Sequence, residues 1–276
     1  MTNNMKDTTL NPEDILYEDN HLLVVRKAPG ILSQEDKTGD PDILTMAKAF
    51  IKERDHKPGK VYMGLVHRLD RNTGGVMCLA KTSKAASRLS DQIRRGQWDK
   101  YYLALSMGLA DLAVLKSVQK NPGLRNLDLD TIDTAIDWLY LEDYLLKDQD
   151  NNKSRVLVQE SLGEKKKSAK AKKALLKTAC IGLDQKSGLK LYLVDLGTGR
   201  SHQIRVQFSS HGLPLIGDRK YQTNIEDYKR REAHLKLPPY FLGLWAWGLK
   251  LYHPVTKEGM LFTALPDTYP WKGFFT

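Results

Sequence analysis

Cysteine is scarce in this chain of 276 residues, which contains only Cys78 and Cys180. The two lie far apart and form no CxxC pair, so the sequence favours neither a disulfide framework nor a zinc–thiolate site. Long apolar runs are also missing, and residues 1–14 are polar and of mixed charge. We therefore expect a soluble protein of a reducing cytoplasm, without a membrane segment.

The common catalytic motifs are absent as well. The sequence contains no P-loop, no HExxH and no GxSxG, and GTG at residues 197–199 is too short for a dinucleotide fingerprint. The seven histidines are scattered without the spacing of metal ligands, so we expect each to pack or to form hydrogen bonds. Several enzyme classes are thus excluded, and no metal site is expected.

Acidic residues are in the minority, since 33 Asp and Glu face 43 Lys and Arg, which gives a formal charge of +10 and a pI of about 9.4. Such an excess favours polyanionic partners, because cations bind phosphates and release their counterions. A basic but unspecialised protein is the alternative. The strongly basic residues 164–174 form either an RNA-contacting edge or a solvated loop.

Apolar periodicity predicts short strands and helices. Strands are expected at two segments within 15–32 and at 76–81, 100–108, 189–196, 242–254 and 259–266. Helices are expected at 42–53 and 82–96, and between a Ser201 cap and a Gly212 stop. Residues 218–236 are so highly charged that we expect an exposed excursion, and residues 109–135 show no regular pattern.

The stretch VHRLDRNTGGV at residues 66–76 places Asp70 between Arg68 and Arg71. A surface ion pair is the simplest interpretation, and such pairs contribute little to stability. However, Gly74 and Gly75 follow closely, and glycines allow the backbone conformations needed by a turn that carries a working side chain. The stretch is therefore a candidate functional site.

Three segments are informative when their order along the chain is considered: VHRLDRNTGG at 66–75, KYYLAL at 100–105, and LGTGRSHQIRV at 196–206 followed by GLPLIGDRKY at 212–221. In this order they resemble the RluA-type family of RNA pseudouridine synthases, and the likeness runs from about residue 15 to residue 266. The resemblance implies an α+β pseudouridine synthase fold. We expect a long, mixed and mainly antiparallel sheet flanked by helices, with a basic cleft across its middle.

The resemblance also implies the domain organisation and the RNA partner. One catalytic domain is expected over residues 12–276, behind a polar leader of residues 1–11. This leaves no room for the small N-terminal RNA-binding domain of many relatives, so we expect the catalytic domain itself to select the RNA. The expected partner is ribosomal or transfer RNA, and a monomer without an obligate protein partner is expected.

Carried over residue by residue, the resemblance implies that Asp70 is the catalytic carboxylate and Arg205 its basic partner. Tyr102 matches the aromatic residue that stacks on the flipped uracil, and Arg68 matches the arginine that replaces the extruded nucleotide. Further substrate contacts are implied for three residues of the same motifs: His67, Arg200 and Ile204. From the residues alone, we would expect Tyr102 to be an ordinary core aromatic and Arg205 a solvated helix charge.

The implied reaction breaks the bond between N1 of uracil and the ribose, rotates the base and joins its C5 to the same ribose carbon. No redox change occurs, so no cofactor is expected. Asp70 either bonds covalently to the sugar or removes a proton to give a glycal-like intermediate, and both routes need an ionised carboxylate. Arg205 is expected to keep Asp70 ionised.

Some expectations concern single residues or other functions. Gly74 stands where serine is more usual in the family, which we expect to be harmless because both residues are small. Asp218 is expected to be structural and to cap a turn. Two other functions stay open: a non-catalytic RNA chaperone or binding protein with the same surface, and a hydrolase with Asp70 and Asp218 as paired acids.

Overall fold

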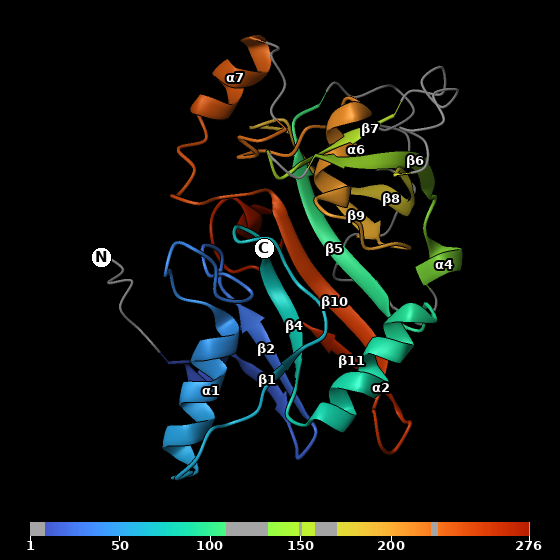
Figure 1. Ribbon diagram of the computed structural model, residues 1–276. Helices are drawn as coiled ribbons and strands as arrows, with labels where there is room; N and C mark the ends of the chain where they lie inside the picture. The colour runs from blue at the N-terminus through green and yellow to red at the C-terminus, as the bar shows by residue number, and fades with distance from the viewer. Residues whose placement is uncertain (1–8, 109–131, 149–150, 158–169, 222–225, 276) are drawn as a thin grey trace. The chain divides into compact units, whose positions relative to one another are not determined.

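The computed structural model describes residues 9–108, 132–148, 151–157, 170–221 and 226–275 (Figure 1). Contacts within the chain divide it into two compact units. The first unit consists of Met1–Lys100 and Trp245–Leu265, and the second of Tyr101–Leu244 and Pro266–Thr276. Each unit therefore combines segments that are far apart in the sequence.

The strands of the first unit follow the order β1, β2, β4 and β10, with β3 paired to β4 and β11 paired to β10. Their bounds are Ile15–Glu18 (β1), Leu22–Lys27 (β2), Gly64–Leu65 (β3), Gly74–Ala80 (β4), Leu244–Tyr252 (β10) and Gly259–Thr263 (β11). The pairing of β4 with β10 is parallel, and the other pairings are antiparallel. The two strand segments predicted within 15–32 are confirmed as β1 and β2, and the two predicted closing strands are confirmed as β10 and β11.

Two helices of the first unit begin where the sequence predicts them. Asp42 caps α1 (Ile43–Arg54) and Thr82 caps α2 (Ser83–Arg94), each with a side-chain oxygen that accepts a backbone hydrogen bond. After α2, Gly96 has a φ of +69°, which glycine adopts without strain. α2 packs on one face of the strands through a cluster that includes Leu22, Val24, Val76, Cys78, Ala85, Leu89, Leu249 and Phe262.

β4 and β10 approach each other closely at two glycines. Gly74 pairs with Trp245 and Gly75 with Ala246. A Cβ atom at Gly75 would overlap the backbone of Ala246, and the φ of +118° at Gly75 is one that other residues rarely adopt. A Cβ atom at Gly74 would overlap the indole of Trp245. Trp245 thus fills the space that a serine side chain would need, which agrees with the expectation that glycine at position 74 is harmless.

The strands of the second unit pair antiparallel throughout, in the order β5, β9, β8, β6 and β7. Their bounds are Asp99–Ser106 (β5), Leu139–Asp148 (β6), Lys153–Val156 (β7), Lys172–Asp184 (β8) and Leu189–Asp195 (β9). The predictions of β5 and β9 are confirmed, whereas β6, β7 and β8 are not among the predicted strands. Residues 172–174 of the basic stretch open β8, and residues 164–169 lie outside the described residues.

The helix predicted between Ser201 and Gly212 is α6 (Gln203–Ser210). The predicted Ser201 cap is wrong, because His202 occupies the N-cap position with a φ of +55° and forms no side-chain capping bond. The Ser201 carbonyl instead accepts a hydrogen bond from Ser154 Oγ at 2.8 Å. The start of α6 is thus fixed by a contact with β7 that the local sequence does not reveal.

The exposed excursion predicted over residues 218–236 is confirmed only in part among the residues described there, since Lys229 and Arg230 are exposed while other side chains are buried. Asp218, Tyr221 and Tyr228 are buried, and Tyr228 OH donates to the Pro214 carbonyl at 3.1 Å from α7 (Glu226–Ala233). The buried tyrosines hold this charged segment against the second unit. Three short helices complete the described elements: Pro12–Asp14, α4 at Ile132–Ala135, and Trp271–Phe274.

Both units combine mainly antiparallel strands with helices, so the predicted α+β class is confirmed. The single catalytic domain over residues 12–276 and the leader over residues 1–11 stay predictions. No helix among the described residues is both long and apolar enough to cross a membrane.

Candidate active site

Asp70 lies on the loop between β3 and β4, and hydrogen bonds to an earlier loop fix the backbone on both sides of it. Ser33 Oγ donates to Leu69 O at 2.7 Å and accepts from Leu69 N at 3.1 Å. Gly30 N donates to Arg71 O at 2.9 Å, and Arg71 Nε donates to Gly30 O at 3.0 Å. The Asp70 carboxylate is therefore carried by a rigid support, as a catalytic group requires.

A buried lysine acts electrostatically on Asp70. Lys27, the last residue of β2, is fully buried, and its Nζ donates to the carbonyls of Ala28, Ile31 and Arg71 at 2.6–3.1 Å. Burial lowers the pKa of Lys27 to about 7, while the negative charge of Asp70 acts in the opposite direction. Three carbonyl acceptors match the three donors of an ammonium group. In its protonated form, which the three carbonyls stabilise, Lys27 thus supplies a cation to Asp70 from within the first unit.

The two arginines beside Asp70 have different surroundings. Arg71 is held by its bond to Gly30 and by an ion pair between its Nη1 and Asp40 at 2.7 Å. Arg68 is exposed, and within the described part of the chain it has no hydrogen bond or ion pair. Arg68 is therefore the arginine that is able to reach an RNA strand, as the family resemblance implies.

His67 is locked into the fold. Its Nε2 accepts a hydrogen bond from Cys78 N at 2.9 Å, and its ring meets Trp98 edge-on with centroids 5.2 Å apart. The residue keeps some exposed surface, but burial of the imidazole, assisted by the charge of Lys100, lowers the pKa of His67 to about 3. The neutral imidazole of His67 thus links the Asp70 loop to β4 through the hydrogen bond that its Nε2 accepts from Cys78 N. The substrate contact of His67 stays a prediction.

Tyr102 lies in β5 opposite Val194 of β9 and is 8% exposed. Directly opposed residues of antiparallel strands project to the same face, as do residues two apart in one strand, so Tyr102 shares its face with Tyr192. The Phe208 ring of α6 packs edge-on against Tyr192 with centroids 5.6 Å apart. α6 therefore packs on the face of the second unit from which Tyr102 projects.

Arg205 of α6 forms a two-point ion pair with Asp218. Nε donates to Oδ2 and Nη2 to Oδ1, both at 2.8 Å, and the two side chains are 12% and 1% exposed. The guanidinium carbon also lies 5.2 Å from the centroid of the Tyr221 ring, which is a cation–π distance. The ion pair and the ring together hold the Arg205 side chain in one position on α6. The pairing of Arg205 with Asp70 stays a prediction.

Asp218 is held from three directions. Besides Arg205, its Oδ1 accepts from the backbone N–H groups of Lys220 and Tyr221 at 3.0 and 3.1 Å. The predicted turn-capping role of Asp218 is confirmed. A carboxylate that accepts hydrogen bonds on both oxygens is unsuited to be the protonated acid of a hydrolase.

The other two predicted contacts differ in exposure. Arg200 is exposed and its Nε donates to the Lys173 carbonyl at 2.9 Å, next to the basic start of β8. Ile204 is 4% exposed, so packing within the second unit accounts for it. Substrate contacts by Arg200 and Ile204 stay predictions.

Three residues that organise the site were not predicted: Lys27, Ser33 and His202. Lys27 belongs to RKAPGIL, which resembles a flank of the family, whereas Ser33 stands in a polar loop without any signal. His202 Nδ1 lies 2.9 Å from Tyr221 OH, which accepts from Ser154 N at 2.7 Å. Among the described residues, no group of three or more His, Cys, Asp or Glu side chains is placed to hold a metal ion.

Comparisons with known proteins agree on one family. The family model described as RNA pseudouridylate synthase matches residues 21–210. "Ribosomal large subunit pseudouridine synthase C" of Buchnera aphidicola subsp. Schizaphis graminum is 30% identical over 270 residues, which are 98% of this chain and 71% of that protein. "Dual-specificity RNA pseudouridine synthase RluA" of Haemophilus influenzae is 28% identical over 254 residues, which are 92% of this chain and 93% of that protein.

Solved structures support the same fold. "Human RNA Pseudouridylate Synthase Domain Containing 1" matches with a TM-score of 0.62 and 20% identity, over 92% of this chain and 83% of that chain. "Human RNA Pseudouridylate Synthase Domain Containing 4" gives a TM-score of 0.62 and 19% identity, over 95% and 92%. Because the family model includes Asp70, Tyr102 and Arg205 and the relatives cover nearly the whole chain, this protein belongs to the RluA-type family of RNA pseudouridine synthases.

Proposed function

We propose that this RNA pseudouridine synthase modifies ribosomal RNA and that Asp70 is its catalytic carboxylate. The observation that carries the proposal is the Asp70 loop, on which a fixed carboxylate has a buried cation, Lys27, acting on it and an exposed Arg68 two residues away. Relatives named as synthases of the large ribosomal subunit support the choice of ribosomal RNA. Transfer RNA is the second substrate to test.

Base flipping explains the need for Arg68 and Tyr102. The bond between N1 and C1′ is not accessible while the uridine is stacked, so the nucleotide must leave the helix. Arg68 is proposed to occupy the vacated position, and Tyr102 to stack on the extruded uracil. Both contacts offset part of the stacking energy that the RNA loses.

The chemistry is a rearrangement without a change in composition. The N1–C1′ bond breaks with its electron pair on N1, the uracil rotates, C5 bonds to C1′, and the proton on C5 is released while N1 gains one. Asp70 either adds to C1′ or removes a ribose proton, and in both cases its negative charge must persist in a partly buried place. Lys27 is proposed to stabilise that charge, together with Arg205 as the family resemblance implies.

We also propose that the protein acts as a monomer in the cytoplasm. The two cysteines are buried free thiols, which suits a reducing compartment. The excess of positive charge supports direct binding of RNA.

The test is to map pseudouridine by carbodiimide labelling and primer extension. Total RNA is compared from cells lacking the protein and from the same cells supplied with wild type, Asp70→Asn or Asp40→Asn. Asp40 is a carboxylate of the same unit that pairs with Arg71 and has no proposed chemical role, so Asp40→Asn is the matched control. We expect specific stops to disappear without the protein and to return with wild type and Asp40→Asn but not with Asp70→Asn.

The mapped positions would identify the RNA. Stops in ribosomal RNA support the proposal, and stops confined to transfer RNA would correct the substrate. If no stop changes although the wild-type protein is folded and binds RNA, the non-catalytic binding protein becomes the better interpretation. If Asp70→Asn restores the stops, Asp70 is not the catalytic carboxylate.

A further inference from the structure

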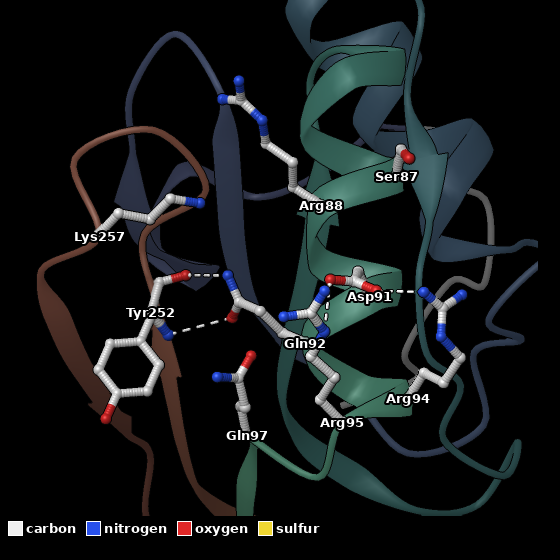
Figure 2. Close-up of a pocket in the computed structure, with 9 residues that line it drawn as sticks. All are labelled: Ser87, Arg88, Asp91, Gln92, Arg94, Arg95, Gln97, Tyr252 and Lys257. Atoms are coloured by element: carbon white, nitrogen blue, oxygen red, sulfur yellow. Dashed lines mark hydrogen bonds and ion pairs between the residues drawn. The ribbon is translucent and has the colours of Figure 1, made fainter.

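A basic pocket of about 570 Å³ lies between α2 and the hairpin formed by β10 and β11, within the first unit (Figure 2). Its lining includes Arg88, Asp91 and Arg94 from α2, Arg95 at the C-cap of that helix, and Lys257 from the hairpin turn. None of the residues in the candidate active site lines it. The pocket is therefore a separate feature of the surface.

The charge of the pocket is strongly positive. Four cationic side chains face one carboxylate, Asp91, which pairs with Arg94 and, at 2.9 Å, with Arg95 Nε. The side chains of Arg94 and Arg95 nevertheless remain 76% and 66% exposed. Exposed guanidinium groups have donors left for a further anion, and their planar fork suits phosphate oxygens.

An aromatic ring stands at the same pocket, and a buried glutamine fixes its backbone. Gln92 is 6% exposed; its Nε2 donates to Tyr252 O at 2.8 Å, and its Oε1 accepts from Tyr252 N at 3.2 Å and from Trp98 Nε1 at 3.1 Å. Figure 2 shows the Tyr252 ring projecting away from this bonded backbone. The ring belongs to a residue that is 47% exposed, so it offers a preorganised face for stacking.

The strand register places the pocket away from Asp70. β4 begins just after the Asp70 loop, and Gly75 pairs with Ala246 in the parallel strand β10. Tyr252 follows Ala246 by six residues in that strand, which is about 20 Å at roughly 3.3 Å per residue. Phosphates of one strand of a DNA duplex recur about every 3.4 Å along the axis, so the span from Ala246 to Tyr252 corresponds to roughly six nucleotides at that spacing.

We propose that the pocket binds the substrate RNA some nucleotides away from the target uridine, with phosphates on Arg94 and Arg95 and a base stacked on Tyr252. Cations that track the backbone beside an aromatic platform are the combination by which proteins hold RNA without reading its sequence. The proposal rests on the proposed function, because it assumes that RNA is the substrate. It gives the catalytic domain a second contact with which to select its RNA.

The test is to measure binding of a fluorescein-labelled oligouridine of about 20 nucleotides by fluorescence anisotropy, between about 50 and 200 mM salt. Arg94→Gln/Arg95→Gln should reduce the slope of log affinity against log salt by about 1.4, since each phosphate contact with a single strand contributes about 0.7. Tyr252→Ala should weaken binding about fivefold or more, and Tyr252→Phe, which keeps the ring, by no more than roughly twofold.

The matched control is Lys52→Gln/Lys84→Gln. It removes two exposed cations of the same unit that do not line the pocket. If the pocket variants and this control have the same affinity and salt slope, the proposal is overturned. A Tyr252→Phe variant as weak as Tyr252→Ala would overturn the stacking contact.

The two proposals fail in different ways. Conversion of uridine is measured with the same proteins on an unmodified transcript of large-subunit ribosomal RNA, with Asp70→Asn as the inactive reference. The pocket is wrong if turnover is present and the pocket variants retain the wild-type affinity and KM. The proposed substrate is wrong if wild type produces no pseudouridine in that transcript, even where the pocket variants lose RNA affinity.

Discussion

Protonation of His67 is expected to weaken the fold as the pH falls. The pKa of His67 is about 3 in the folded protein, against an ordinary value of 6.5. Between these values the unfolded chain binds a proton that the folded chain does not, so stability rises with pH and is lost on acidification. At pH 5, which is 1.5 units below 6.5, the loss is about 2 kcal/mol at most, at about 1.36 kcal/mol per unit.

The measurement is urea unfolding of wild type and His67→Gln at about pH 7 and pH 5. Glutamine keeps an oxygen acceptor for Cys78 N but does not titrate, and all other titrating groups are shared by the two proteins. Wild type should therefore lose up to about 2 kcal/mol more than the variant between the two pH values. An equal loss in both proteins would show that His67 is not held neutral, and the proposed support of the Asp70 loop would lose its basis.

Three further substitutions test the structure around the site. Lys27→Met removes the ammonium group that acts on Asp70, and we expect kcat to fall about tenfold or more with little change in KM. Steady-state kinetics that show a normal kcat would contradict this role of Lys27. Gly74→Ser should reduce the free energy of unfolding in urea by about 1–3 kcal/mol, because the serine side chain would overlap Trp245. This loss should be smaller in a Trp245→Leu background, and an unchanged loss would argue against the overlap. Asp218→Asn leaves the buried Arg205 without its anion and should cost about 3 kcal/mol or more in thermal or urea unfolding, and a cost below about 1 kcal/mol would show that the pair is not structural.

Elements with local signals could be predicted from the sequence. α2 is the clearest case, because Thr82 supplies a cap, Gly96 a stop, and Ala85 and Leu89 an apolar face within one short segment. β6 and β7 lack such signals, since their residues are largely exposed and the apolar residues of β6 do not alternate regularly with its charged ones. Their pairing with each other and with β8 depends on tertiary context.

The same distinction applies to the candidate site. Asp70, Tyr102 and Arg205 are found through family motifs, whose order along the chain is visible in the sequence. The function of Lys27 is not visible in this way, because its burial depends on the Arg71 carbonyl 44 residues later. A lysine at the end of a strand is ordinarily expected at the surface. The close fit of Gly74 against Trp245 is hidden for the same reason, since Trp245 comes from a distant part of the chain.

The close pairing of Gly75 with Ala246 has a consequence for synthesis on the ribosome. Ala246 follows Gly75 by about 170 residues, which takes roughly 10 to 35 s at translation rates of about 5–20 residues per second. During that interval β4 lacks its parallel neighbour β10, and its edge is available to other strands. The nascent chain therefore contains the Asp70 segment long before β10 is synthesised. We expect chaperones that shield exposed strand edges to have their largest effect on folding during this interval.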